Sequence, residues 1–174
     1  FRNKFNISAS GLSGNGGYRK KYLVGIDRVE RMCGVPIKLL AYRRFLESNP
    51  QWVGQCVMIQ YGIRCPERGA DYIETQKRIK QEIMEINLAT TGLDDGGDNP
   101  SVIYKEVDRV DVYERTALFQ LCDIYLNTCV RQALDLMPLE YCAIHMSDQN
   151  AECGILAISE FASASRILPG AVVF

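Results

Sequence analysis

The fold is decided by residues 22–48, which open with the apolar run Tyr22-Leu23-Val24-Gly25-Ile26, short enough to be one buried strand. From Pro36 onward, apolar side chains recur at helical spacing until Asn49-Pro50 ends the pattern. A buried strand followed by an amphipathic helix is the repeating unit of a parallel α/β sheet. This stretch therefore predicts the first such unit.

The same alternation continues along the chain. Further strands are predicted at residues 56–60, 102–104, 124–129 and 155–158, with a last apolar run at 171–174. Helices are predicted at 71–90 and 111–122, from about 135–138 onward, and as a short segment at 161–167. Nearly continuous apolar strands alternating with helices favour an α/β fold, a Rossmann-like parallel sheet flanked by helices on both faces, with ligands at the carboxyl ends of the strands.

Length and charge limit the classes of function. The chain has 174 residues, 47% of them hydrophobic, which fits one globular domain with a substantial core. Twenty Lys and Arg against 21 Asp and Glu give a formal net charge of −1, so we expect no nucleic-acid partner and no anionic membrane surface as partner. No apolar stretch reaches the roughly 20 residues of a membrane span.

Composition also suggests boundaries. Residues 1–19 are rich in Ser, Gly and Asn and are expected to form a flexible loop or linker, which leaves 20–174 as the folded lobe. The acidic, Gly-rich residues 93–100 are expected to be a mobile surface insertion. Because the chain begins with Phe1 and stops in an apolar run, we expect an excised segment of a longer protein.

The cysteines indicate a reducing compartment, and hence a cytoplasmic protein. Their number is odd, seven, and none forms a Cys-x-x-Cys motif, so they are expected to be core thiols rather than disulfides or metal ligands. With His145 as the only histidine, the sequence offers no zinc site, and we expect this side chain to have a structural role.

Three transitions from strand to helix carry candidate site residues. Arg28 follows the first strand and could bind a phosphate; an ion pair with Asp27 or Glu30 is the structural alternative. Asp135 is suited to cap the helix that contains Glu140. In the structural alternative, Glu140 is a surface carboxylate that the helix dipole favours in the first turn. At the third transition, a capping role explains Ser159 as well as a contact with a ligand would. The sequence contains no Ser/His/Asp or Cys/His arrangement with supporting context and no phosphate-binding Gly-rich loop after a strand.

Several blocks together resemble the carboxyl-terminal half of the trehalose-6-phosphate synthase family, retaining glycosyltransferases of GT-B type with two Rossmann-like lobes. The blocks, in order, are GIDRVE (residues 25–30), GVPIKLLA (34–41), FLESNPQW (45–52), YER (113–115), LMPLEY (136–141) and SEFA (159–162). The resemblance covers about residues 20–174. It implies that this lobe binds a UDP-glucose donor, while the other lobe binds glucose 6-phosphate.

The resemblance also implies roles for individual residues. Arg28 would contact and stabilise the donor diphosphate, the backbone at Leu136 and Met137 would lie beneath the phosphates, and Glu140 would hold the ribose hydroxyls. Gln132 and Asp135 would lie at the glucose and diphosphate. UDP or UDP-glucose is then the ligand, with no cofactor and no metal.

Departures from the family pattern predict a weakened donor site. Cys33 stands where the family has a second phosphate-binding Lys, and Gln132 and Asp135 stand where it has Asp and Asn. The family's Arg after the second strand falls near Pro66 or is displaced to Arg68. These details resemble the catalytically silent plant branch, class II-like proteins in which a synthase-like domain precedes a phosphatase-like one.

Three functions remain open on this basis. The first is a degenerate donor lobe with a regulatory or assembly role, partnered by an amino-terminal acceptor lobe, a phosphatase-like domain of the same chain and a synthase complex. The second is a working transferase lobe with altered donor preference. The third is a plain protein-interaction domain with a vestigial site. In all three, the 174 residues alone are expected to be inactive, since half of a two-lobed site is missing.

Overall fold

The computed structural model describes residues 20–92, 100–147 and 154–174. The predicted linker at 1–19, the acidic residues 93–99 and Cys153 lie outside these ranges.

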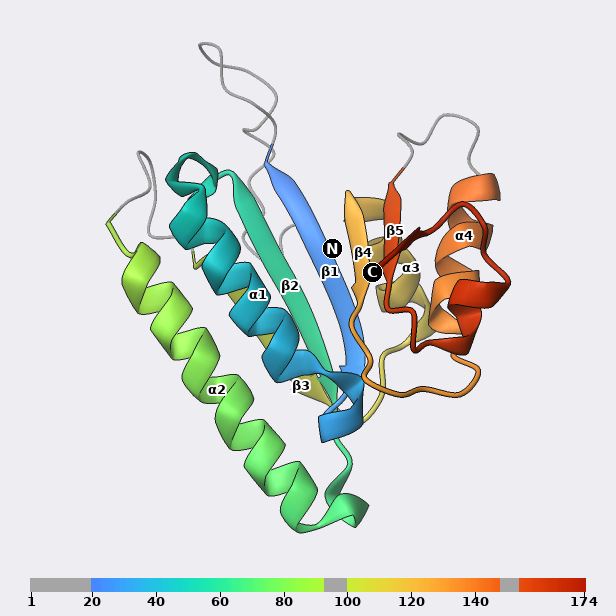
Figure 1. Ribbon diagram of the computed structural model, residues 1–174, viewed down its shortest axis with the longest axis horizontal. Coiled ribbons are helices and arrows are strands. Elements are labelled where there is room, and N and C mark those ends of the chain that lie inside the picture. The colour runs from blue at the N-terminus through green and yellow to red at the C-terminus, as the bar shows by residue number, and fades with distance from the viewer. Residues whose placement is uncertain (1–19, 93–99, 148–153) are drawn as a thin grey trace.

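The described strands form one six-stranded sheet in which all neighbours are parallel, in the order β3-β2-β1-β4-β5-β6 (Figure 1). This is the doubly wound strand order of Rossmann-like folds, so the predicted fold class is confirmed. The strands are β1 (Lys21–Arg28), β2 (Cys56–Ile63), β3 (Val102–Val107), β4 (Ile124–Asn127), β5 (Ile155–Ile158) and β6 (Val172–Val173).

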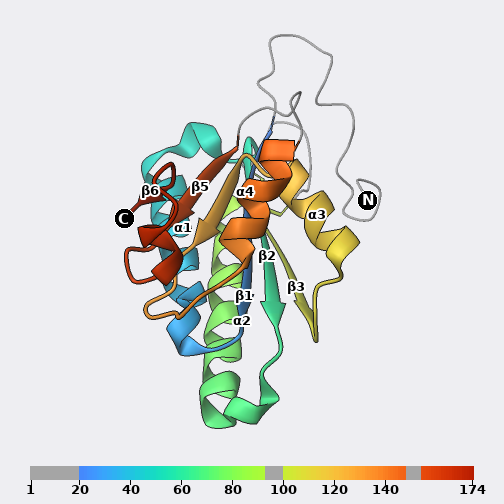
Figure 2. The same cartoon turned by 90° about the vertical axis from the view of Figure 1, so that its right-hand side faces the viewer.

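Helices cover both faces of the sheet. On one face lie α1 (Val35–Ser48) and α2 (Ala70–Thr90); on the other lie α3 (Val112–Leu121) and α4 (Met137–Ser147) (Figure 2). The two cores follow from the alternation of side chains along a strand. In β2, for example, Met58 packs with α1 and α2, whereas Ile59 packs with α3 and α4. No helix in the described ranges is both long and apolar enough to cross a bilayer.

Two elements differ from the sequence prediction. Strand β4 ends at Asn127 rather than at Cys129, because the Asn127 side-chain oxygen accepts a hydrogen bond from the Cys129 N–H (3.2 Å) and turns the chain. The helix predicted at 161–167 is a 3-10 turn of four residues, Ser163–Arg166. Shorter 3-10 turns follow β1 (Arg31–Cys33) and β2 (Pro66–Arg68).

A buried ion pair joins α1 to the sheet. The Lys38 side chain is 0% exposed and that of Asp27 is 5% exposed, and their Nζ and Oδ2 atoms are 2.6 Å apart. Gln60 completes the cluster, since its Oε1 accepts from Lys38 (3.1 Å) and its Nε2 donates to Asp27 (2.9 Å). Gly25 leaves the room for this cluster, because a Cβ there would overlap Lys38 Nζ and Gln60 Oε1.

The described cysteines and His145 are largely buried within the fold. Five of the six described cysteines are buried, Cys142 is half-buried, and all six are free thiols. The His145 ring lies 4.4 Å from the Tyr141 ring, centroid to centroid, and its Nε2 is 3.0 Å from the Phe119 carbonyl oxygen. These contacts anchor α4 on α3 and agree with the structural role expected for His145.

Candidate functional site

The strand order reverses between β1 and β4, and ligands of doubly wound folds bind at the carboxyl ends of the strands at such a point. The segments that follow β1 and β4 are joined here. The Met32 carbonyl accepts from the N–H of Val130 (2.8 Å), and the Thr128 hydroxyl donates to the Gly34 carbonyl (3.4 Å). Gly34 has a φ of +71°, and a Cβ there would overlap the Thr128 carbonyl oxygen. The backbone after β1 therefore lies directly against the backbone after β4 at the centre of the candidate site.

Arg28 ends β1 and reaches this edge of the sheet. Its Nη2 donates to Glu67 Oε1 (2.8 Å) and its Nε to Cys65 Sγ (3.1 Å), while Glu30 Oε1 lies 3.9 Å from Nε. The hydrogen bond to Cys65 is the main cause that raises the pKa of Arg28, so the guanidinium stays charged. Of the two ion-pair partners expected for Arg28, Glu30 is confirmed. Asp27 is wrong, because its carboxylate is buried and paired with Lys38.

Arg68 lies in the same cluster of charges. Its Nε is 2.8 Å from Glu30 Oε2, so that Glu30 stands between Arg68 and Arg28. The 3-10 turn Pro66–Arg68 delivers both Glu67 and Arg68 from the end of β2 to the end of β1, its paired neighbour. The sequence left the position of Arg68 open. In the structure Arg68 and Arg28 share Glu30 as an ion-pair partner.

Cys33 does not replace a cation in this cluster. Burial, with the negative charges of Asp27 and Glu30, raises the pKa of its thiol well above the usual range. The thiol therefore stays neutral and donates to Glu30 Oε1, with 3.6 Å between sulfur and oxygen.

On the β4 side, Gln132 and Asp135 converge on one buried amide. Asn127 Nδ2 donates to Gln132 Oε1 and to Asp135 Oδ2, each at 3.2 Å. Asp135 Oδ1 also accepts from the N–H of Met137 (3.1 Å), which confirms the expected capping role at the start of α4. Desolvation is the main cause that raises the pKa of Asp135, and the charges of Asp27 and Glu140 add to it.

Leu136 and Met137 open α4 as the sequence predicts, and their neighbour Glu140 lies in its first turn. Glu140 is not an unpaired surface carboxylate, because its Oε2 accepts from Arg115 Nε of α3 at 2.5 Å. Sequence reasoning missed this contact and that of Glu67 with Arg28. The only available signal was that Glu67 follows β2, next to β1; nothing local relates Arg115 to Glu140.

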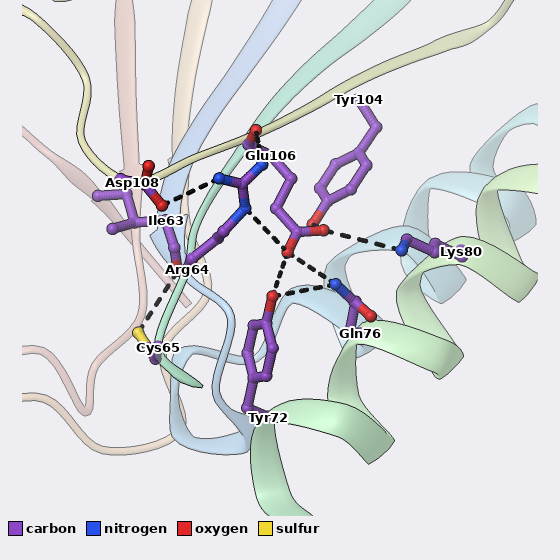
Figure 3. Close-up of polar contacts among 9 residues, drawn as sticks. All are labelled: Ile63, Arg64, Cys65, Tyr72, Gln76, Lys80, Tyr104, Glu106 and Asp108. Atoms are coloured by element: carbon purple, nitrogen blue, oxygen red, sulfur yellow. Dashed lines mark hydrogen bonds and ion pairs between the residues drawn. The ribbon is translucent and has the colours of Figure 1, made fainter. Parts of the chain in front are cut away.

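Two further places are explained without a ligand. Ser159 Oγ accepts from the Phe161 N–H (3.2 Å), a local turn of the capping type expected. Near the carboxyl end of β3, Glu106 gathers several polar side chains (Figure 3). It accepts from Tyr72 (2.5 Å) and Gln76 (2.7 Å), and its bond raises the pKa of Tyr72 to about 12. This second cluster ties α2 to the end of β3.

The described residues include no group of three or more His, Cys, Asp or Glu side chains that could hold a metal ion. What the arrangement offers instead is a cation, Arg28, and a helix start, Met137, on the two sides of the strand-order reversal. Both kinds of group recognise phosphate in proteins.

Comparison with known proteins points to one family. The model of glycosyltransferase family 20 matches residues 12–174. The chain is 35% identical over 153 residues to alpha,alpha-trehalose-phosphate synthase [UDP-forming] A of Dictyostelium discoideum, covering 88% of this chain and 20% of the relative. A Candida albicans synthase of the same description is 31% identical, with 88% and 30% covered. The chain thus spans less than a third of the length of these relatives.

Solved structures agree on the fold. A structure described as trehalose-6-phosphate from E. coli bound with UDP-2-fluoro glucose superposes with a TM-score of 0.77 at 22% identity, over 89% of this chain and 33% of that one. The trehalose-6-phosphate phosphatase N-terminal domain of Candida albicans superposes with a TM-score of 0.75 at 27% identity, over 89% and 31%. Because the family model matches nearly the whole sequence, the chain belongs to glycosyltransferase family 20.

Proposed function

We propose that this chain is the donor-side lobe of a trehalose-phosphate synthase-like protein and that its site takes a uridine diphosphate sugar. In this proposal Arg28 binds the diphosphate, the backbone at Leu136 and Met137 lies beneath the phosphates, and Glu140 accepts from the ribose hydroxyls. One observation carries the proposal: Arg28 and the start of α4 flank the reversal of strand order between β1 and β4.

The reaction of the whole protein would transfer glucose from UDP-glucose to glucose 6-phosphate in trehalose biosynthesis. The bond between the glucosyl anomeric carbon and the diphosphate oxygen breaks, and UDP leaves with the bonding electrons. The acceptor hydroxyl forms the new bond and loses its proton. Arg28 would stabilise the charge that develops on the leaving diphosphate, which is the contribution that a fixed cation makes to such a step.

We further propose that this donor site is weak and that the protein acts mainly in regulation or assembly. Cys33 is a neutral thiol where the family pattern has a cation, and one lost charge-assisted bond costs roughly 1.5–3 kcal/mol. Asp135 adds a negative charge beside the N–H of Met137. Both features lower the affinity expected for a diphosphate.

The relatives are longer synthases, so the other partners are part of the proposal. They are an acceptor-binding amino-terminal lobe, a phosphatase-like domain of the same protein and a synthase complex, in the cytoplasm. The buried free thiols support a reducing compartment. Without the acceptor lobe, the 174-residue chain is expected to show no transferase activity.

A working lobe with altered donor preference is the second candidate. It is favoured by one contact: the Gln132 amide is held by Asn127 together with Asp135, so an amide rather than a carboxylate faces the sugar in this proposal. Because Asn127 already uses the Gln132 oxygen, this amide would offer its N–H groups, which favour a sugar substituent that accepts hydrogen bonds.

Isothermal titration of the chain with UDP and UDP-glucose at low salt tests the proposal. Binding with a dissociation constant in the micromolar to low-millimolar range is expected, and Arg28→Ala and Glu140→Ala should each weaken it. Arg44→Ala and Glu47→Ala, on the outer part of α1, are the matched controls and should leave it unchanged. No binding of either ligand up to several millimolar would contradict the proposal and favour a plain interaction domain.

A further inference from the structure

We infer that two carboxylates of the chain itself occupy the anion-recognising groups of this site, so that a diphosphate binds by displacing Glu67 from Arg28 and Asp135 from the N–H of Met137. The nature of the ligand that displaces these carboxylates rests on the proposed function. The occupation of the two groups rests on contacts within the described residues.

The first contact joins Glu67 to Arg28. A carboxylate oxygen bonded to a guanidinium N–H at 2.8 Å uses the same donor that a phosphate oxygen would use. The backbone of Glu67 is held by the turn in which Arg68 N–H bonds to the Cys65 carbonyl (2.9 Å). Its side chain is 59% exposed and that of Arg28 is 48% exposed, so Glu67 can rotate into solvent without disturbing the core. Glu67 is therefore a local and replaceable occupant.

The second contact joins Asp135 to the start of α4. The N–H groups of a first helical turn are the donors that hold a phosphate at a helix N-terminus. The N–H of Met137 is one of them, and Asp135 Oδ1 already accepts from it at 3.1 Å. The other oxygen, Oδ2, stays bonded to Asn127. A phosphate can use the Met137 N–H only when Asp135 releases it.

If binding requires this displacement, a ligand with two phosphate groups should bind more tightly than a ligand with one. Each occupant carries one negative charge and is tethered beside its donor, which favours it over a free ligand of equal charge. A diphosphate that reaches both groups would replace both occupants at once, whereas a monophosphate would replace only one. The site should therefore discriminate UDP from UMP more strongly than the loss of a single phosphate contact would.

The test is a titration of the 174-residue chain with inorganic pyrophosphate, UDP and UMP. The variants are Glu67→Gln, Asp135→Asn, the double variant, and Arg28→Ala with and without Glu67→Gln. Asn caps helices about as well as Asp, so Asp135→Asn retains the start of α4 while it removes the negative charge with which residue 135 competes for the Met137 N–H. Glu47→Gln is the matched control: it removes the same charge and an exposed pair with Arg43 (3.9 Å), on the last turn of α1.

Glu67→Gln is expected to raise the affinity for pyrophosphate and UDP by about two- to fivefold, the range corresponding to exposed ion pairs. Asp135→Asn should raise it by a similar factor, and the double variant by roughly the product if the two act separately. Glu47→Gln should have no effect. In the Arg28→Ala background, Glu67→Gln should no longer raise the affinity, because the guanidinium that Glu67 occupies is absent.

The outcomes separate this inference from the proposed function. If the unmodified chain binds no UDP but the double variant binds pyrophosphate, the inference holds and the proposed function fails. If the unmodified chain binds UDP and the two substitutions leave its affinity unchanged or lower it, the inference is overturned while the proposed function stands. If no variant binds either ligand, both are overturned. A gain equal to that of Glu47→Gln would also overturn the inference, since it would reflect net charge alone.

Discussion

Replacing Lys38 with Met should destabilise the protein strongly, although Lys is the residue type found least often in cores. In the structure Lys38 is fully buried, and its ammonium lies 2.6 Å from Asp27 Oδ2. Met has a similar length and shape, so the substitution removes the charge while it leaves little cavity. Among the residues that the structure describes, the Asp27 carboxylate then keeps only its bond from Gln60 (2.9 Å) and remains buried without a cation.

The expected loss follows from that geometry. Breaking a buried pair by removing one partner costs about 3–5 kcal/mol. Domains are stable by roughly 5–15 kcal/mol, so a large part of the total disappears. At about 2–4 °C per kcal/mol for a chain of this size, the melting temperature should fall by about 6–20 °C.

Urea unfolding of Lys38→Met, Asp27→Asn and the double variant measures the effect and the coupling. The double variant should lose less than the sum of the single losses, with a coupling free energy of about 2 kcal/mol or more. Lys21→Met is the matched control: it removes a half-exposed ammonium that lies 2.9 Å from Asp123, and it should cost about 1 kcal/mol or less. A loss for Lys38→Met below about 1 kcal/mol, or strictly additive losses, would refute the reasoning.

Three other substitutions test neighbouring features. Arg115→Ala should release Glu140 and weaken UDP binding about two- to tenfold, while pyrophosphate binding measured by the same titration stays constant; equal losses for both ligands would contradict a role at the ribose. Because the folded-state pKa of Asp135 is raised, its ionised form costs stability at neutral pH, and this cost is relieved as pH falls through that pKa; Asp135→Asn should therefore be slightly more stable than the unmodified chain at pH 7 in urea unfolding, with the difference shrinking toward pH 4. A variant that is less stable at pH 7 would show that the sign is wrong. Gly25→Ala should cost about 1–3 kcal/mol, because its Cβ would overlap Lys38 and Gln60; a thermal melt unchanged from the unmodified chain would mean that this cluster can shift freely.

The sequence predicts the parallel sheet well because its strands are nearly continuous apolar runs separated by long amphipathic helices. It overestimates the length of β4, because the turn at Asn127 depends on one side-chain hydrogen bond that hydrophobic periodicity does not reveal. Among the contacts at the candidate site, the sequence predicts the local ones, Arg28 with Glu30 and the Asp135 cap, but not those between distant segments. Arg28 contacts Glu67 because β2 lies beside β1. A contact between side chains from two different strands leaves no pattern in the local sequence of either one. For the same reason, nothing in the spacing of α1 distinguishes buried Lys38 from an exposed lysine.

The contact of Gly34 with the Thr128 carbonyl also bears on how this family can diverge. A side chain at residue 34 would have to adopt a left-handed backbone and push apart the two segments that hold the sheet halves together, so most substitutions there disrupt folding. Arg28 and Glu67 are about half exposed, and exchanging them costs little folding free energy. Mutations at these proposed ligand contacts should therefore be purged for misfolding far less often than mutations at this glycine. The shape of the lobe can therefore be kept while the exposed side chains at its edge change, which leaves a stable surface on which other roles can evolve.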